Sequence, residues 1–299
     1  MKRFLSLCVA GSYSILIGAF VGAITWLFLT LIFSGINLIW YDFIFKINNN
    51  YLVLFVCILG GIMVGLCQKY FGKYPKTMPI VLKEFKETKR VEYKSLHKSI
   101  ISALIILWFG ASLGPEAALS GIVGGLVTLS GDLLKYGFKR KEIENDLNEI
   151  LIESSIESTI GIIFAAPLYG FYSLISNKDK IKKAKTIVYV LTISSGFYVF
   201  DLLSKLDNRA SFITRFSKAN IGKRELLFFI PLLIVGFLLT LYYKKMGSVL
   251  NKILKPLDDY KAIKAVLGGG LLAILGITIP YIFFSGEHEL KDIILNWKV

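Results

Sequence analysis

The sequence predicts an all-α fold, that of a polytopic membrane protein with tilted and broken helices. Of the 299 residues, 55% are hydrophobic and 19% are charged, against about 25% charged residues in soluble domains. Long runs carry no charge at all. A bilayer core of about 30 Å needs roughly 20 apolar residues in a helix, and lipid offers the backbone no hydrogen-bond partner, so helices are expected. The charge-free runs are 4–41, 47–68, 158–177, 226–243 and 265–286.

The first helix is expected at about 4–40. Lys2 and Arg3 precede it, as in a signal peptide. However, its apolar part far exceeds the roughly 7–15 residues of a signal-peptide core, and no A-x-A cleavage site follows. The run is also too long to cross a bilayer upright. We therefore expect one long, tilted membrane helix, or a helix followed by a re-entrant piece.

The next elements follow from the apolar runs and the polar stretches between them. A second helix is expected at about 51–70, and a basic loop at 71–98. Two shorter apolar pieces, 99–113 and 117–131, flank Gly114-Pro115-Glu116.

The polar stretch 135–157 has its apolar residues on one face, which predicts an amphipathic interfacial helix. A helical region at 158–176 is interrupted at Pro167. With no Ser/Gly linker in the chain, we expect a single transmembrane domain over 1–299 and no soluble domain. The remaining apolar segments are 186–203, 226–243 and 265–285.

The formal net charge of +14 is explained by basic loops. Residues 69–98 hold nine Lys and Arg against three acidic residues. By the positive-inside rule this loop is cytoplasmic, and so is the amino terminus, two crossings earlier. The basic stretch 204–224 fits less well, because simple counting puts it outside. No nucleic-acid partner is expected, since the basic residues lie between membrane segments.

Glycine pairs at four-residue spacing recur along the chain. Such pairs let membrane helices approach closely, and they indicate packing rather than a site. The pairs are Gly18/Gly22, Gly61/Gly65 and Gly121/Gly125.

Glu116 is the best candidate for a functional residue. An ionisable group between two apolar segments costs free energy when it is left unpaired in lipid, so its presence there suggests a function. Pro115 suits the first position of a new helix. That helix is expected to end near Ser130, which makes it too short to cross the membrane, so its amino end would lie inside the bilayer. Free N–H groups and the helix dipole attract an anion there, and the Glu116 carboxylate would compete for the same donors. The alternative is a carboxylate that caps a helix at the interface.

A second broken element supports the first. The segment 161–171 places Pro167 and Gly170 within an apolar run. Paired interrupted segments point to a binding site in mid-membrane. The alternative is a proline kink in an ordinary helix.

These motifs resemble the CLC family of chloride channels and proton/chloride exchangers. Members carry G-x-E-G-P, or G-P-E-A-P in one divergent prokaryotic branch, and the sequence has Gly114-Pro115-Glu116-Ala117-Ala118, with alanine in place of the last proline. The family element A-F-N-A-P-L-A-G is similar to residues 163–170, in the same order and about fifty residues later. The resemblance implies a CLC-like fold in a prokaryotic cell membrane. It also implies that chloride is transported without any cofactor.

The same resemblance implies the site. Glu116 corresponds to the gating glutamate. The second broken helix contributes Phe164, Ala165, Ala166 and Pro167. Lys76 stands at the position of the family's anion-coordinating serine, and Lys76 or Thr77 would supply a donor in its place. The other anion-binding residues are Ser112, Leu113, Gly114, Pro115 and Ala117.

Two departures from the family shape the functional hypotheses. Asn177 stands where exchangers often have an inner glutamate, which favours passive, voltage-gated-type anion conduction over proton exchange. The second inverted half of the family pattern is missing, since no G-x-F-x-P motif occurs. The chain is therefore expected to be a channel or transporter subunit, as a homodimer or with a separate second-half chain. The alternative is a truncated, non-transporting scaffold. An enzyme is not expected, because Glu149, Glu153 and Glu157 recur at helical spacing with no His or D-x-x-D pattern nearby.

Overall fold

The computed structural model describes residues 2–47, 49–137, 142–171, 183–206, 222–284 and 286. All regular elements in these ranges are helices, which confirms the predicted all-α class. They are α1 (Lys2–Ile36), the π-helical η1 (Asn37–Ile44), α2 (Phe45–Ile47), α3 (Asn50–Tyr70), α4 (Met78–Thr88), α5 (Leu96–Trp108), α6 (Glu116–Gly137), α7 (Glu142–Ile163), the short η2 (Tyr169–Phe171), α9 (Lys183–Leu206), α10 (Lys223–Leu254), η4 (Lys255–Leu257), α11 (Lys261–Thr278) and η5 (Pro280–Ile282).

Five of the described helices are long and apolar enough to cross a membrane. This confirms the prediction of a multi-pass membrane protein. The helix α5 is a shorter apolar helix. The spans are Val9–Ile47, Asn50–Tyr70, Lys185–Leu206, Leu227–Leu257 and Lys261–Thr278.

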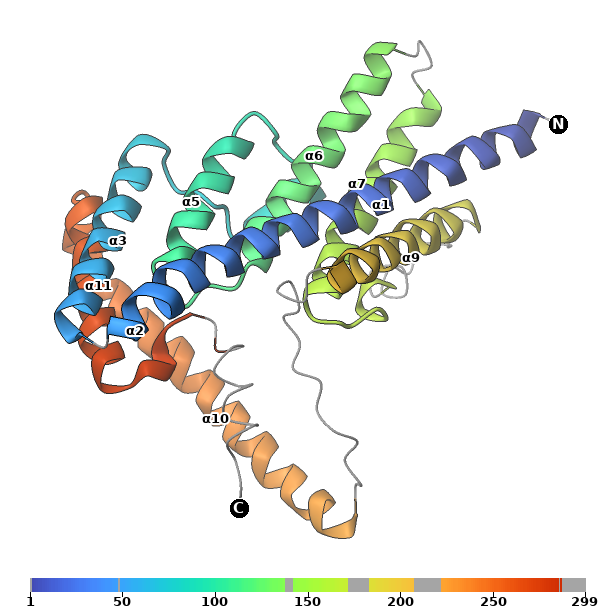
Figure 1. Ribbon diagram of the computed structural model, residues 1–299. Helices are drawn as coiled ribbons and strands as arrows, with labels where there is room; N and C mark the ends of the chain where they lie inside the picture. Colours follow the sequence, from blue (N-terminus) through green and yellow to red (C-terminus); the bar gives the residue numbers. More distant parts are fainter. Residues whose placement is uncertain are drawn as a thin grey trace.

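The first span is one continuous helical rod. The helix α1 passes directly into η1 and α2, so the amino-terminal run is a single long helix with a widened π turn near its end. Figure 1 shows this rod running along the body of the molecule. The π turn buries two large side chains completely, those of Trp40 and Ile44.

Glycines bring two helix pairs into close contact, as their spacing predicts. The helices α1 and α9 pack along each other, and a Cβ atom on Gly18 or Gly22 would collide with the α9 backbone. The helices α3 and α11 form the second pair. There, a Cβ atom on Gly61 would lie 2.8 Å from the carbonyl oxygen of Ala265. The hydrophobic effect gives no attraction between helices in lipid, so close packing of the backbones at these glycines stabilises the helix pairs.

Two predicted boundaries are wrong. The helix after Pro115 continues past Ser130 to Gly137, giving 22 residues or about 33 Å. The first charge after the apolar run does not end the helix, because Asp132 forms an ion pair with Arg90 and the helix continues beyond it. The helix is therefore not too short to cross the membrane.

The second wrong boundary concerns the polar stretch 135–157. The expected break between 157 and 158 is not found. The helix α7 begins at Glu142, inside this stretch, continues past 158 to Ile163 and packs between α6 and α9. Leu151, Ile152 and Ile156 are at most 2% exposed, and neighbouring serines are equally buried. Hydroxyl groups that look polar in the sequence fit a helix–helix interface, where small side chains allow close packing.

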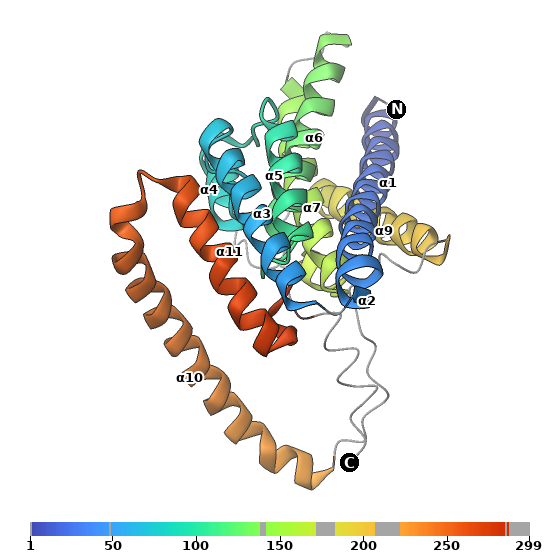
Figure 2. The same cartoon turned by 60° about the vertical axis from the view of Figure 1, so that its left-hand side comes forward.

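The helix α10 stands apart from the other helices. Figure 2 shows it separated from α11 and from the body of the molecule. None of its hydrophobic window is buried within the described part of the chain. An apolar helix with this exposure is suited to face lipid or another chain.

Candidate functional site

The connection between α5 and α6 carries the main candidate site. The helix α5 ends at Trp108, and Gly110 adopts a left-handed backbone with φ of 83°. The N–H group of Ala111 then donates to the carbonyl oxygen of Ile106 at 3.3 Å, which satisfies a carbonyl at the helix end. Residues 111–114 are not helical. The sequence Gly-Ala-Ser-Leu-Gly-Pro therefore unwinds the chain between the two helices, as its glycines predict.

The amino end of α6 has free donors. Its first backbone hydrogen bond runs from the Leu119 N–H group to the Pro115 carbonyl oxygen, at 2.9 Å. The N–H groups of Glu116, Ala117 and Ala118 precede that bond and have no partner in the helix ladder. Pro115 lies one residue before the first helical position, rather than at it. Since Pro115 and Ala118 are buried, this positive helix end is partly covered by the protein and is not fully open to its surroundings.

The Glu116 side chain folds back over Gly114. A Cβ atom on Gly114 would collide with both carboxylate oxygens, so the absence of a side chain there makes room for the carboxylate. Glu116 is half-buried, and it makes no hydrogen bond or ion pair with the residues that the structure describes. The carboxylate thus occupies space at the amino end of α6, with no cation in the described ranges paired to it.

The residues before Glu116 differ in exposure. Ser112 is exposed, whereas Leu113 and Gly114 are half-buried. The N–H group of Leu113 donates to the carbonyl oxygen of Ala111 at 2.9 Å. Ser112, Leu113 and Gly114 lie on the unwound segment, and Ala117 is the second residue of α6, so chain continuity alone places all four beside Glu116.

The second broken element is a helix end. The helix α7 stops at Ile163, and Ala165 has a positive φ of 42°. The N–H group of Ala166 donates to the carbonyl oxygen of Gly161 at 2.8 Å, and that of Ala165 to the carbonyl oxygen of Ile162 at 3.2 Å. This pair of bonds is a Schellman motif with alanine in the position that usually holds glycine. The interruption at Pro167 is thus a helix end and not a kink. Phe164, Ala165 and Pro167 are exposed.

The two broken elements lie at the same end of the α6–α7 hairpin. A side chain on Gly131 would meet Asn148, and one on Gly124 would meet Ile156. Going seven residues back along α6 therefore corresponds to going eight residues forward along α7. Following the two helices in these directions leads to the start of α6 at Glu116 and to the end of α7 at Ile163. The sequence alone does not fix this pairing, because the side-chain contacts between α6 and α7 set it.

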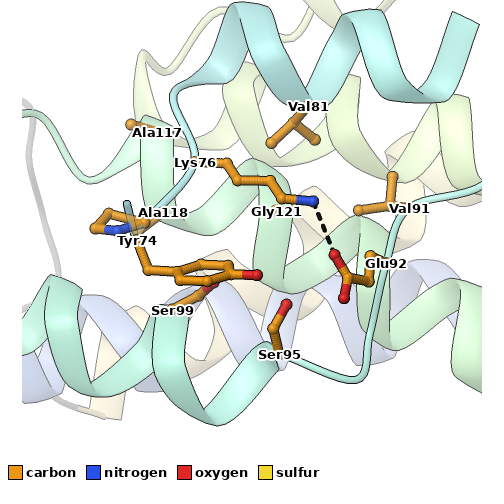
Figure 3. Close-up of a pocket in the computed structure, with 11 residues that line it drawn as sticks. Tyr74, Lys76, Val81, Val91, Glu92, Ser95, Ser99, Ala117, Ala118 and Gly121 are labelled. Carbon is orange, nitrogen blue, oxygen red and sulfur yellow. Dashed lines mark hydrogen bonds and ion pairs between the residues drawn. The ribbon is translucent and has the colours of Figure 1, made fainter. Parts of the chain in front are cut away.

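Lys76 lies in a small pocket beside the first turns of α6. The pocket has room for about one water-sized sphere, near 10 Å³, and its lining includes Tyr74, Ser99, Ala117 and Gly121. Figure 3 shows the Lys76 ammonium pointing toward Glu92 across the pocket. Lys76 and Ala117, both predicted near the anion, are therefore neighbours.

The charge of Lys76 is already compensated. Its Nζ atom is 2.8 Å from Glu84 Oε2 and 3.0 Å from Glu92 Oε2. Burial disfavours the ammonium form, but the hydrogen bonds that Lys76 donates to both glutamates outweigh this effect and raise the pKa of Lys76. The three groups together carry a charge of −1 when all are ionised. An anion that approaches Lys76 must compete with two carboxylates.

Thr77 and the remaining candidates lie outside this pocket. Thr77 is exposed and is the residue before α4. Asn177 and most of the basic stretch 204–224 lie outside the described residues. Among the described residues, no cluster of His, Cys, Asp or Glu is suited to a metal ion. Glu149 and Glu153 form ion pairs with Lys89 and Lys185.

A comparison with protein families decides what kind of protein this is. The family model described as voltage gated chloride channel matches residues 60–298. The chain belongs to this family. The match to the voltage gated chloride channel family runs from α3 onward and includes Glu116, Lys76 and the end of α7. No curated protein matches the chain.

Membership of the voltage gated chloride channel family confirms the resemblance stated from the motifs. It identifies the protein as a chloride channel or transporter of the CLC type, in a bilayer and with an anion as its cargo. The roles of Glu116, Lys76, Thr77 and the other candidate residues stay predictions.

The sequence did not point to three residues around the site. Glu84 and Glu92 pair with Lys76 from eight and sixteen positions away, and Lys76 and Glu92 lie outside α4, so no helical period connects the three residues. Trp40 contacts the α5–α6 connection from far along the chain. The basic loop 69–98 contains only three acidic residues, which makes Glu84 and Glu92 noticeable in the sequence. Nothing in the sequence indicates the role of Trp40.

Proposed function

We propose that this CLC-family chain conducts anions passively and that Glu116 is its gate. The observation that supports the proposal is the position of the Glu116 carboxylate, folded over Gly114 at the free amino end of α6. A helix amino end carries the equivalent of about half a positive charge. A passing halide and the carboxylate would compete for that charge.

The gate would open when the carboxylate leaves the helix end or takes up a proton. Because no cation among the described residues pairs with Glu116, little holds the side chain in place. The free N–H groups of Ala117 and Ala118 would then accept the anion. Ser112, Leu113 and Gly114 would line its path, and the exposed turn Phe164–Pro167 would face it from the end of α7.

Passive conduction is favoured over proton exchange by Asn177. Its amide cannot carry a proton, and it stands where the family resemblance puts a proton-transferring glutamate. Lys76 would act as an anion ligand only after release from Glu84 and Glu92, so we assign it a secondary role. Thr77 would offer one further hydroxyl donor near the start of α4.

The test is chloride efflux from liposomes that contain the purified protein. Glu116→Gln and Glu116→Ala are each expected to change the efflux rate. Glu87→Gln is the matched control, because Glu87 is 63% exposed and forms only a long 3.8 Å pair with Lys83. If both Glu116 variants reconstitute well and conduct like the parent protein, the gating role is refuted. A pH change inside lightly buffered liposomes, coupled to chloride movement, would instead support exchange.

A second candidate function is that of one subunit in a larger pore, or of a scaffold that does not transport. The unburied window of α10 favours it, because a partner chain or a second copy would cover such a helix. Liposomes with the purified chain alone decide the matter. Chloride efflux without a partner refutes the scaffold, whereas efflux that appears only with a co-purified chain supports the subunit.

A further inference from the structure

The start of the α5–α6 connection, which leads to Glu116, is held by two parts of the chain that are distant in sequence. The carbonyl oxygen of Trp108, at the end of α5, accepts a hydrogen bond of 2.8 Å from the indole Nε1 of Trp40. The carbonyl oxygen of Gly110 accepts one of 3.1 Å from the N–H group of Phe284. Both carbonyls lie at a helix end, where the helix ladder leaves them without a donor.

Trp40 is placed for this contact by the π helix. It is completely buried and lies in the middle of η1. A π turn holds about one residue more than an α turn, so it redirects the side chains that follow, and such turns are frequent at functional sites. A Cβ atom on Gly110 would lie 2.9 Å from the Trp40 ring, so the left-handed glycine and the indole fit against each other.

Aromatic side chains of the carboxyl-terminal segment complete the contact. The Trp40 ring lies 4.6 Å from the Phe283 ring and 5.4 Å from the Phe284 ring, measured between centroids. Phe283 is 1% exposed and fills the space beside Gly276, where any side chain would collide with it. The indole is therefore fixed on its faces by packing and at its nitrogen by the Trp108 carbonyl.

A second indole fixes the same helix end to α1. Nε1 of Trp108 donates to the carbonyl oxygen of Leu31 at 3.0 Å. Its ring occupies the space left by Gly35. Trp40 on the amino-terminal rod thus donates a hydrogen bond to the end of α5, and Trp108 at that end donates one back to the rod.

We infer that Trp40 is a positioning residue for the Glu116 gate: its indole N–H sets the start of the unwound segment whose other end presents Glu116. Only residues 109–115 separate the Trp108 carbonyl from α6. Neither Trp40 nor Phe284 is close to Glu116 in sequence. The inference rests on the proposed gating role of Glu116 and adds to it a residue that acts through the backbone.

The test replaces the indole donor and keeps an aromatic ring. Trp40→Phe removes the hydrogen bond to the Trp108 carbonyl. The matched control is Trp26→Phe, because the Trp26 indole nitrogen is buried on the same helix with no hydrogen-bond partner among the described residues. Chloride efflux is measured against chloride concentration for both variants, alone and combined with Glu116→Gln. Size-exclusion profiles and thermal midpoints report on folding.

Trp40→Phe is expected to change the maximal efflux by about fivefold, the size that one hydrogen bond supports. The change should vanish when Glu116→Gln is also present, and Trp26→Phe should behave as the parent. A merely structural role would lower efflux equally in both backgrounds, and this result would overturn the inference. Parent-like efflux from well-folded Trp40→Phe would overturn it too.

Two further outcomes are distinguishable. If Glu116→Gln alone leaves efflux unchanged, the gating role fails and the positioning role fails with it. If Glu116→Gln acts but Trp40→Phe does not, only the positioning role fails. Should Trp40→Phe not fold, Phe284→Ala removes a ring that packs on Trp40 while keeping the Phe284 amide, and the same two expectations apply to it.

Discussion

Replacing Gly114 by alanine should displace the Glu116 carboxylate from the end of α6. The added Cβ atom would collide with both carboxylate oxygens, so the side chain must adopt another rotamer. Gly114 is outside the left-handed backbone region, unlike Gly110, and alanine therefore adds no backbone strain. The substitution isolates the position of the carboxylate from its charge.

The magnitude follows from the helix end. A carboxylate beside a helix amino end gains about 0.3–1 kcal/mol, and about 2 kcal/mol when partly buried. Since 1.4 kcal/mol is a factor of ten, losing this interaction should favour the anion by roughly twofold to thirtyfold. We expect chloride efflux from liposomes to rise by that factor in Gly114→Ala.

Gly121→Ala is the control for this experiment. It makes the same change seven residues later, in α6, yet its Cβ atom would lie 3.5 Å from Val81 Cγ2, an ordinary contact. Its efflux should match the parent. If Gly114→Ala folds and conducts like Gly121→Ala while Glu116→Gln does alter efflux, then the carboxylate does not block the helix end from its present position, and the competition argument is wrong.

Three further predictions concern packing and charge. Gly22→Ala should lower the unfolding free energy in detergent by about 1–3 kcal/mol, because its Cβ atom would collide with the α9 backbone; Gly11→Ala, which makes an ordinary 3.4 Å contact, should not. Lys76→Met should lower the unfolding free energy by about 1 kcal/mol through loss of the ion pairs with the two glutamates, a figure reduced because these side chains are partly exposed. Because the folded pKa of Lys76 is raised from 10.5, that contribution is fully present below pH 10.5 and is lost only as the pH rises through the folded value; a smaller thermal-midpoint difference at pH 9 than at pH 7 would contradict it. Leu151→Ala should lower the unfolding free energy by about 2–5 kcal/mol, as in a core. Leu133→Ala, at a 66% exposed position, should lower it much less. Equal losses would show that Leu151 is not packed as a core residue.

Much of the fold could be predicted from where charges are missing. The second helix was expected at 51–70 and is found at Asn50–Tyr70. Helix ends were less predictable where charges find partners. Asp132 pairs with Arg90, and Glu153 with Lys185, so α6 and α7 continue through charges that would otherwise mark the membrane boundary. Periodicity does not show such long-range pairs.

The candidate site divides in the same way. The unwound turn at Gly110–Pro115 and the helix end near Pro167 follow from local chemistry, since glycine and proline act on the backbone where they stand. The contacts of Trp40 and of Lys76 depend on tertiary packing. Their partners Trp108 and Glu92 are 68 and 16 residues away, and no spacing rule connects them.

The continuous rod of α1 and η1 links the bilayer itself to the α5–α6 connection. The 35 residues of α1 alone measure about 53 Å, longer than a hydrocarbon core of about 30 Å. A helix of this length fits a membrane by tilting, and its tilt follows the thickness of the lipid. One end of this lever packs on α9, and the other carries Trp40. Bilayer thickness bears on the tilt of this helix, so the lipid chain length has to be held constant when the efflux rates of variants are compared.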